Sequence, residues 1–304
     1  MRKAAKKRTH DSGTAKRRPG RVTTRSTAGP GFVFEDQVAA WLLLKMLTGE
    51  AMPGMDGRLG LRLQSQTSAL GWLIDNLLVT CEPESEESHL ALSCKSNLQV
   101  TSAGLPHDFV SAAWKQFTNA GTGPLRRGRD RIALVTRGYY PAFQAVWADI
   151  KNACTGSDPA LVLARIRSTS KHRTVFDNIK KVVQESSATV RDEDVLEFVR
   201  HLLVVPMNFD LDPSEDRESA ISQCRRVLTS AAPDEARALW QTLVERAGKA
   251  RLGDGTIDLP QLWHELRIRF KALSAARAHR KTVTHGGHRF SLEILDERTV
   301  APAG

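Results

Sequence analysis

Paired cysteines and long apolar runs are both missing from this sequence of 304 residues, and each absence excludes a class of protein. The four cysteines form no CxxC pair, so the sequence does not predict a zinc knuckle. The longest apolar runs, such as residues 39–44, are far too short to cross a bilayer, and the basic N-terminus lacks the apolar core of a signal peptide. We therefore expect a cytoplasmic protein with reduced thiols and no membrane partner.

Acidic residues are nearly absent from the first 29 residues, which hold ten Lys and Arg side chains and one acid, Asp11. This segment therefore carries +9 of the total charge of +10, and the rest of the chain is close to neutral. It has too few apolar side chains to fold alone, so we expect residues 1–30 to be a disordered basic tail. The interpretations that stay open are an arm that contacts phosphates, and a solvated leader or an extension from an upstream start site.

Two β-rich runs, residues 72–81 and 89–95, flank an acidic turn in the pattern of a hairpin with a longer loop. Asp75 interrupts the first run, with three apolar residues on either side. Ser93 and Lys95 lie two residues apart on the second run, so strand alternation puts both on one face. An acid on one strand with a lysine on its neighbour is typical of a metal-dependent phosphodiesterase site.

This pattern resembles the PD-(D/E)xK nuclease superfamily. More narrowly, it resembles the double-stranded-DNA nuclease domain of bacterial anti-phage effectors that are linked to nucleotide-signal sensors or to STAND ATPases. The stretches that carry the resemblance are 31–37, 74–76, 92–95 and 239–270. It spans most of residues 31–273, with one departure: Ser93 stands where the family has Glu or Gln.

The resemblance implies a Mg²⁺ site, with Mn²⁺ as a substitute, at which Asp75, Ser93, Lys95 and Glu35 are catalytic. Asp75, Glu35 and the backbone carbonyl of Cys94 would hold the metal. Lys95 would orient or deprotonate water and offset the charge of the phosphate. The alternatives are structural: Glu35 would only complement its helix dipole, and Asp75 would be a strand-edge acid in solvent.

The resemblance also implies double-stranded DNA as a partner. The basic and amide side chains expected to contact it come from a helix at 107–120, from the loop 121–131 and from the tail. They are Lys115, Gln116, Arg126, Arg127, Arg129, Lys16, Arg17 and Arg18. For the helix and the loop, the alternative is a solvent-facing surface without a role.

The order helix, three strands, helix, strand, helix, strand predicts the α/β class. The resemblance makes this a restriction-endonuclease-like mixed sheet flanked by helices, followed by a mostly helical C-terminal region. The expected strands include 58–66, 132–136, 161–166 and a short edge strand at 202–208. The expected domains are a tail at 1–30, a nuclease core at 31–168, a mostly helical region packed on the core at 169–273, and a linker or tail at 274–304.

The predicted function is therefore that of a metal-dependent DNA endonuclease, an anti-phage effector domain controlled by a partner or by an adjoining sensor or ATPase module. A homo-oligomer is a further hypothesis about its assembly. The alternative is a catalytically degenerate nuclease fold that serves as a DNA-binding or assembly module. Ser93 favours this alternative, whereas Asp75, Lys95 and Glu35 favour the enzyme. The sequence contains no P-loop, GxSxG or HExxH motif.

Overall fold

The computed structural model describes residues 30–273 with short gaps, together with one pair of short strands near the C-terminus. The gaps are residues 75, 83–85, 97–99, 103, 122, 188, 210–213, 229–231, 254 and 272. The predicted tail, apart from Pro30, lies outside the described residues. Of the predicted segment 274–304, the structure describes only β7 (Thr284–His285) and β8 (His288–Arg289), which pair with each other.

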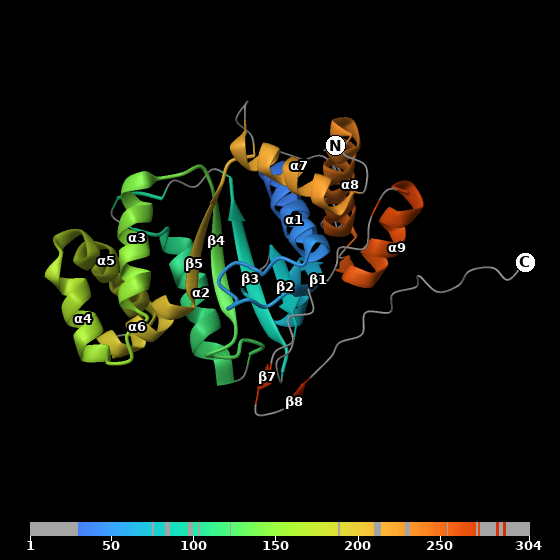
Figure 1. The fold of residues 1–304 in the computed structure, drawn as a ribbon. Coiled ribbons are helices and arrows are strands. Elements are labelled where there is room, and N and C mark those ends of the chain that lie inside the picture. The colour runs from blue at the N-terminus through green and yellow to red at the C-terminus, as the bar shows by residue number, and fades with distance from the viewer. Residues whose placement is uncertain are drawn as a thin grey trace, which may run out of the picture.

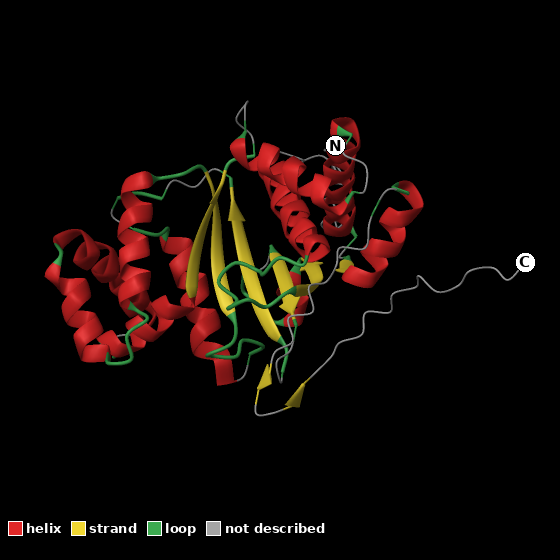
Figure 2. Ribbon diagram, viewed as in Figure 1, coloured by secondary structure: helices red, strands yellow, loops and turns green. Residues whose placement is uncertain are grey.

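A six-stranded mixed sheet forms the centre of the molecule, with the strands in the order β5-β4-β3-β2-β1-β6 (Figure 1). Antiparallel pairing joins β6, β1, β2 and β3, whereas β3, β4 and β5 run parallel. The strands are β1 (Gly60–Ser65), β2 (Leu77–Cys81), β3 (Ser88–Lys95), β4 (Arg131–Arg137), β5 (Leu202–Met207) and β6 (Thr256–Asp258). This arrangement confirms the predicted mixed α/β sheet flanked by helices (Figure 2).

One face of the sheet is covered by four helices, and the innermost of them, α1, is mostly apolar. The four are α1 (Pro30–Thr48), α7 (Glu215–Val227), α8 (Pro233–Leu252) and α9 (Leu259–Arg269). Phe34, Val38 and Leu42 of α1 are completely buried, because α1 packs against the strands on one side and against α7 and α8 on the other. Gly49, at φ 65°, follows the end of α1, where a left-handed residue costs a glycine nothing.

The other face packs against a second group of helices (Figure 1). They are α2 (His107–Thr118), α3 (Pro141–Ala153), α4 (Pro159–Ser168), α5 (Ser170–Ser186) and α6 (Asp192–His201), and two short 3₁₀ turns, η2 (Thr67–Leu70) and η3 (Asn119–Gly121), lie among the loops. Strand side chains alternate between the two cores, so that Leu90 and Leu92 meet α1 while Ala91 meets the second group. No helix among the described residues is long and apolar enough to span a bilayer.

Two elements differ from the sequence prediction. Residues 161–166, predicted as a buried strand, form the middle of α4. Strand β6 was not predicted; it is three residues long and pairs with β1. The predicted edge strand is confirmed as β5, with Pro206 on the outermost strand of the sheet, where a missing N–H is tolerated. Both outer strands come from the segment 169–273, and the division of the chain at residue 168 stays a prediction.

Candidate functional site

A chain of two hydrogen bonds connects α1 to the end of β3. Glu35, in the second turn of α1, is buried, with 7% of its surface exposed. The amide of Asn76, just before β2, donates from Nδ2 to Glu35 Oε2 at 3.0 Å, and its Oδ1 accepts the Cys94 N–H at 2.9 Å. One residue's N–H and C=O leave a strand on the same side, so the Cys94 carbonyl also points toward β2, beyond the last β2–β3 pair, Leu77 and Leu92.

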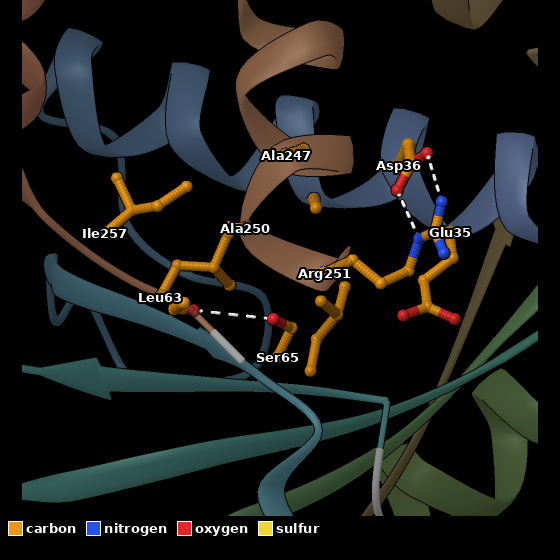
Figure 3. Close-up of a pocket in the computed structure, with 11 residues that line it drawn as sticks. Glu35, Asp36, Leu63, Ser65, Ala247, Ala250, Arg251 and Ile257 are labelled. Carbon is orange, nitrogen blue, oxygen red and sulfur yellow. Dashed lines mark hydrogen bonds and ion pairs between the residues drawn. The ribbon is translucent and has the colours of Figure 1, made fainter. Parts of the chain in front are cut away.

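Asp36, the residue after Glu35, is bound by Arg251 of α8 (Figure 3). Arg251 donates two hydrogen bonds to the Asp36 carboxylate, at 2.8 and 3.0 Å, and both side chains are 14% exposed. The guanidinium also lies over the ring of Phe32 at 4.5 Å. The hydrogen bond to Asp36, and to a lesser extent the charge of Glu35, raises the pKa of Arg251. Gly248 allows the approach of α8, because a Cβ there would lie 3.1 Å from Asp36 Oδ2.

Between α1, α8 and β1 lies a small cavity of about 10 Å³, lined by Glu35, Asp36 and Arg251 together with apolar side chains (Figure 3). At its other end, the Ser65 hydroxyl donates to the carbonyl of Gly255 at 3.4 Å. A volume of this size holds no more than one water molecule. The cavity is therefore a packing gap beside Glu35 and not a ligand pocket.

Ser93 and Lys95 do not share a face of the sheet with Glu35. Cys94 packs on the core that contains α1, so alternation turns Ser93 and Lys95 toward the face of the second helix group. Ser93 is 6% exposed. Lys95 is half-buried, and its side chain forms no ion pair or hydrogen bond with any described residue. Glu35 and Lys95 thus approach the end of β3 from opposite faces.

The metal site expected from the sequence is only partly described. Asp75 lies outside the described residues. Across the part of the chain that the structure describes, no three His, Cys, Asp or Glu side chains gather closely enough to hold a metal ion. Burial, and then the nearby charge of Glu35, raises the pKa of the Cys94 thiol well above its ordinary value, so this thiol stays protonated. If Cys94 serves a metal, it does so through its backbone carbonyl.

The predicted phosphate contacts on α2 have different surroundings. Gln116 is 1% exposed, and its Oε1 accepts the N–H of Leu73, so it fixes the loop before β2. This burial contradicts a direct contact between Gln116 and a nucleic acid. Lys115 is exposed, as expected.

The arginines of the loop before β4 make internal contacts. Arg127 lies over the ring of Phe117 at 4.2 Å and donates to the Phe117 carbonyl at 3.2 Å. Arg126 donates to the carbonyl of Gly123 at 2.9 Å, and Arg129 pairs with Glu86. Arg127 and Arg129 thus hold the loop to other parts of the molecule, whereas the Arg126 hydrogen bond lies within the loop. The three basic tail residues, Lys16, Arg17 and Arg18, lie outside the described residues.

No family model matches this chain, and no curated protein matches its sequence. Solved structures do match. The Acinetobacter baumannii Cap4 SAVED/CARF-domain containing receptor matches at 12% identity and a TM-score of 0.47, over 80% of this chain and 48% of that one. The same receptor with the cyclic trinucleotide 3'3'3'-cAAA matches at 12% identity and a TM-score of 0.46, with the same coverage. The Moraxella osloensis receptor of the same description matches at 16% identity and a TM-score of 0.43, again over 80% and 48%.

These comparisons contradict the predicted family, function and partner. The chain spans about half the length of the structures it matches, and these are described as receptors, not as nucleases or DNA-bound proteins. We therefore correct the assignment to the PD-(D/E)xK superfamily, the endonuclease function with its degenerate alternative, and double-stranded DNA as partner. The DNA-contact roles fall with that partner: Lys115, Gln116, Arg126, Arg127, Arg129, Lys16, Arg17 and Arg18.

Proposed function

We propose that this chain is a Mg²⁺-dependent hydrolase that acts on a phosphodiester bond of a small nucleotide ligand. The observation that supports the proposal is the Asn76 bridge, which connects the carboxylate of Glu35 to the backbone of Cys94. Lys95 is the next residue in the sequence. An acid and a cation therefore lie at one end of the sheet, on either side of the last residues of β3.

The described donors suit magnesium, which prefers a few hard oxygen ligands and keeps several waters. Glu35 and the Cys94 carbonyl would hold the ion. We add Asp75 as a third ligand because it directly precedes Asn76 in the sequence. When bound, Mg²⁺ supplies a Lewis acid for the phosphate and a more acidic water. Lys95 would offset the negative charge of the phosphate from the other face. Ser93 is too buried for contact with a ligand, so we assign it no chemical step.

The cyclic trinucleotide 3'3'3'-cAAA serves as the test substrate, because it is the phosphodiester named with one of the similar structures. Hydrolysis would add one water, break one P–O bond and open the ring to a linear trinucleotide. The assay is mass spectrometry of the ligand after incubation with the protein and Mg²⁺ or Mn²⁺. We expect Glu35→Gln and Lys95→Met each to lower the rate by roughly 100-fold or more.

Two exposed residues provide matched controls for these substitutions. Lys115→Met removes an exposed lysine on α2, and Glu245→Gln removes an exposed acid on α8, so both variants should keep the rate of the wild type. Bis(p-nitrophenyl) phosphate tests the chemistry without a nucleotide. A wild-type protein that cleaves neither compound at any Mg²⁺ or Mn²⁺ concentration would overturn the proposal. So would a Glu35→Gln variant that matches the wild type.

We also propose a restriction-endonuclease-like arrangement for the mixed, helix-flanked sheet. We further propose that the protein is cytoplasmic; among the described residues, no helix is long and apolar enough to span a membrane.

A further inference from the structure

A hollow of about 360 Å³ lies at the opposite end of the sheet from Glu35, where β4 and β5 begin. Arg131 opens β4, while Arg200 and His201 end α6, and all three line the hollow. The loop 155–157, which follows α3, completes the wall. None of the site residues predicted from the sequence lines this space.

Arg200 builds the wall of the hollow. Its guanidinium donates to the carbonyls of Cys154 at 3.1 Å and Gly156 at 2.8 Å, just beyond the end of α3. It also pairs with Glu197 Oε2 at 3.1 Å. These bonds satisfy carbonyls that the end of a helix leaves without partners. Arg200 is therefore committed to structure, and its charge is largely offset by Glu197.

Arg131 has donors to spare. It donates from Nη1 to the Asp130 carbonyl at 3.1 Å and from Nη2 to Asp56 at 3.3 Å, and Asp56 is 80% exposed. A guanidinium carries five N–H groups, so three of them bond to no described residue. The side chain is 18% exposed, which restricts it to few orientations at the edge of the hollow. It is a partly fixed cation with free donors.

The charge around the hollow is positive. Lys151 reaches from α3 to the carbonyls of Val199 and Arg200, at 3.1 and 2.8 Å, and adds a third cation near Arg131 and Arg200. The acids that face these three cations are Glu197 and Asp56, which leaves one positive charge in excess.

His201 adds no charge to this balance. Its Nε2 accepts the Gly128 N–H at 2.9 Å, so the proton of the neutral ring lies on Nδ1, which donates to the Glu197 carbonyl at 2.8 Å. The ring is 2% exposed and ties the Gly128 loop to α6. His201 therefore fixes the shape of the hollow.

We propose that this hollow binds a small phosphate-bearing ligand, with Arg131 as its anchor. The planar fork of a guanidinium matches the oxygens of a phosphate, and its donors here are not consumed by the fold. The volume lies in the range of pockets that hold one small molecule, about 300–1,000 Å³. The site is separate from the proposed hydrolase site, and the two proposals stand or fall independently.

The test is isothermal titration calorimetry of the full chain with inorganic phosphate, AMP and adenosine. We expect the wild type to bind phosphate-bearing compounds and Arg131→Gln to bind them at least 10-fold more weakly. Arg131→Lys keeps a point charge without the fork and should restore part of the affinity. Arg165→Gln removes an exposed arginine on α4 and is the matched control. The melting temperature of each variant checks that it is folded.

The three compounds distinguish the sources of the phosphate. Equal affinity for inorganic phosphate and AMP supports a site for the phosphate alone, whereas tighter binding of AMP supports a nucleotide site. Equal affinity for adenosine and AMP would overturn the proposal, because the phosphate charge would then contribute nothing to binding. A wild type that binds no phosphate-bearing compound at millimolar concentration, or Arg131→Gln that binds like the wild type, would overturn it too.

Discussion

Replacing Arg251 by methionine tests whether the contact between α1 and α8 depends on a charge pair. Methionine keeps the unbranched stem of the side chain but removes the guanidinium from Asp36. It also removes the cation that lies over Phe32. The Asp36 carboxylate, 14% exposed, would then be enclosed without its partner.

Removing one partner of a buried ion pair costs about 3–5 kcal/mol, and the partial exposure of this pair puts the expected loss near the lower value, about 3 kcal/mol. For a chain of this size, that corresponds to a fall in melting temperature of roughly 6–12 °C. Asp36→Asn should cost less, because Glu35 still attracts the Arg251 charge. The two substitutions differ in their expected cost because Arg251 interacts with two acids, Asp36 and Glu35.

The assay is thermal and urea unfolding of both single variants and of Asp36→Asn/Arg251→Met, combined in a double-mutant cycle. We expect a coupling energy of about 2 kcal/mol. Arg237→Met is the matched control on the same helix, because Arg237 pairs with Asp234 at the surface and should contribute less than about 0.5 kcal/mol. A coupling energy no larger than that of the surface pair would refute the reasoning.

Two further predictions concern single buried side chains. Burial lowers the pKa of His201 from 6.5. Below that pH the unfolded chain binds a proton that the folded chain does not bind, so the free energy of unfolding decreases as the pH is lowered. His201→Gln should reduce this loss of stability at acidic pH, which is at most about 1.4 kcal/mol per pH unit. The assay is urea unfolding between about pH 5 and 7, the range around the ordinary histidine pKa. Gln116→Leu leaves the Leu73 N–H without its acceptor and should cost about 1–3 kcal/mol, whereas the exposed neighbour Lys115→Met should change the melting temperature little. Equal effects of the two α2 substitutions would contradict the role of Gln116.

The sequence predicted the elements whose periodicity is local and long. Helix α1 shows a dense apolar pattern that ends at Gly49, and β1 alternates apolar and polar residues as a half-buried strand does. Strand β5 was placed at an edge because Pro206 cannot donate to a ladder. Each of these predictions rests on a physical constraint that acts within a few residues.

The wrong assignment at 161–166 has an identifiable cause. A short apolar run does not distinguish a buried strand from a buried helix. The deciding signal came just before it: Asp158 accepts the N–H groups of Ala160 and Leu161 as an N-cap, and Pro159 occupies the first helical position. Leu161 is 69% exposed, as one outward position on a helix allows.

The surroundings of Glu35 could not be predicted in the same way, because they come from distant parts of the chain. Asp36 and Arg251 are 215 residues apart in sequence, and no local pattern connects them. Strand β6 has only three residues, too few to show alternation, although it completes the sheet beside β1. The sequence indicated Glu35 as a candidate, but the clamp around it depends on tertiary contacts.

Asn76 shows why an amide, and not an acid, suits the position next to Asp75. The backbone N–H of Cys94 can only donate, so it must meet the amide oxygen, and this leaves the NH₂ group for Glu35. An aspartate at position 76 could accept the Cys94 N–H but would face the buried Glu35 carboxylate without a donor. Two acids in contact cannot both stay ionised at little cost, so one would take up a proton. The amide therefore joins α1 to β3 without adding a second acid at position 76 beside Glu35.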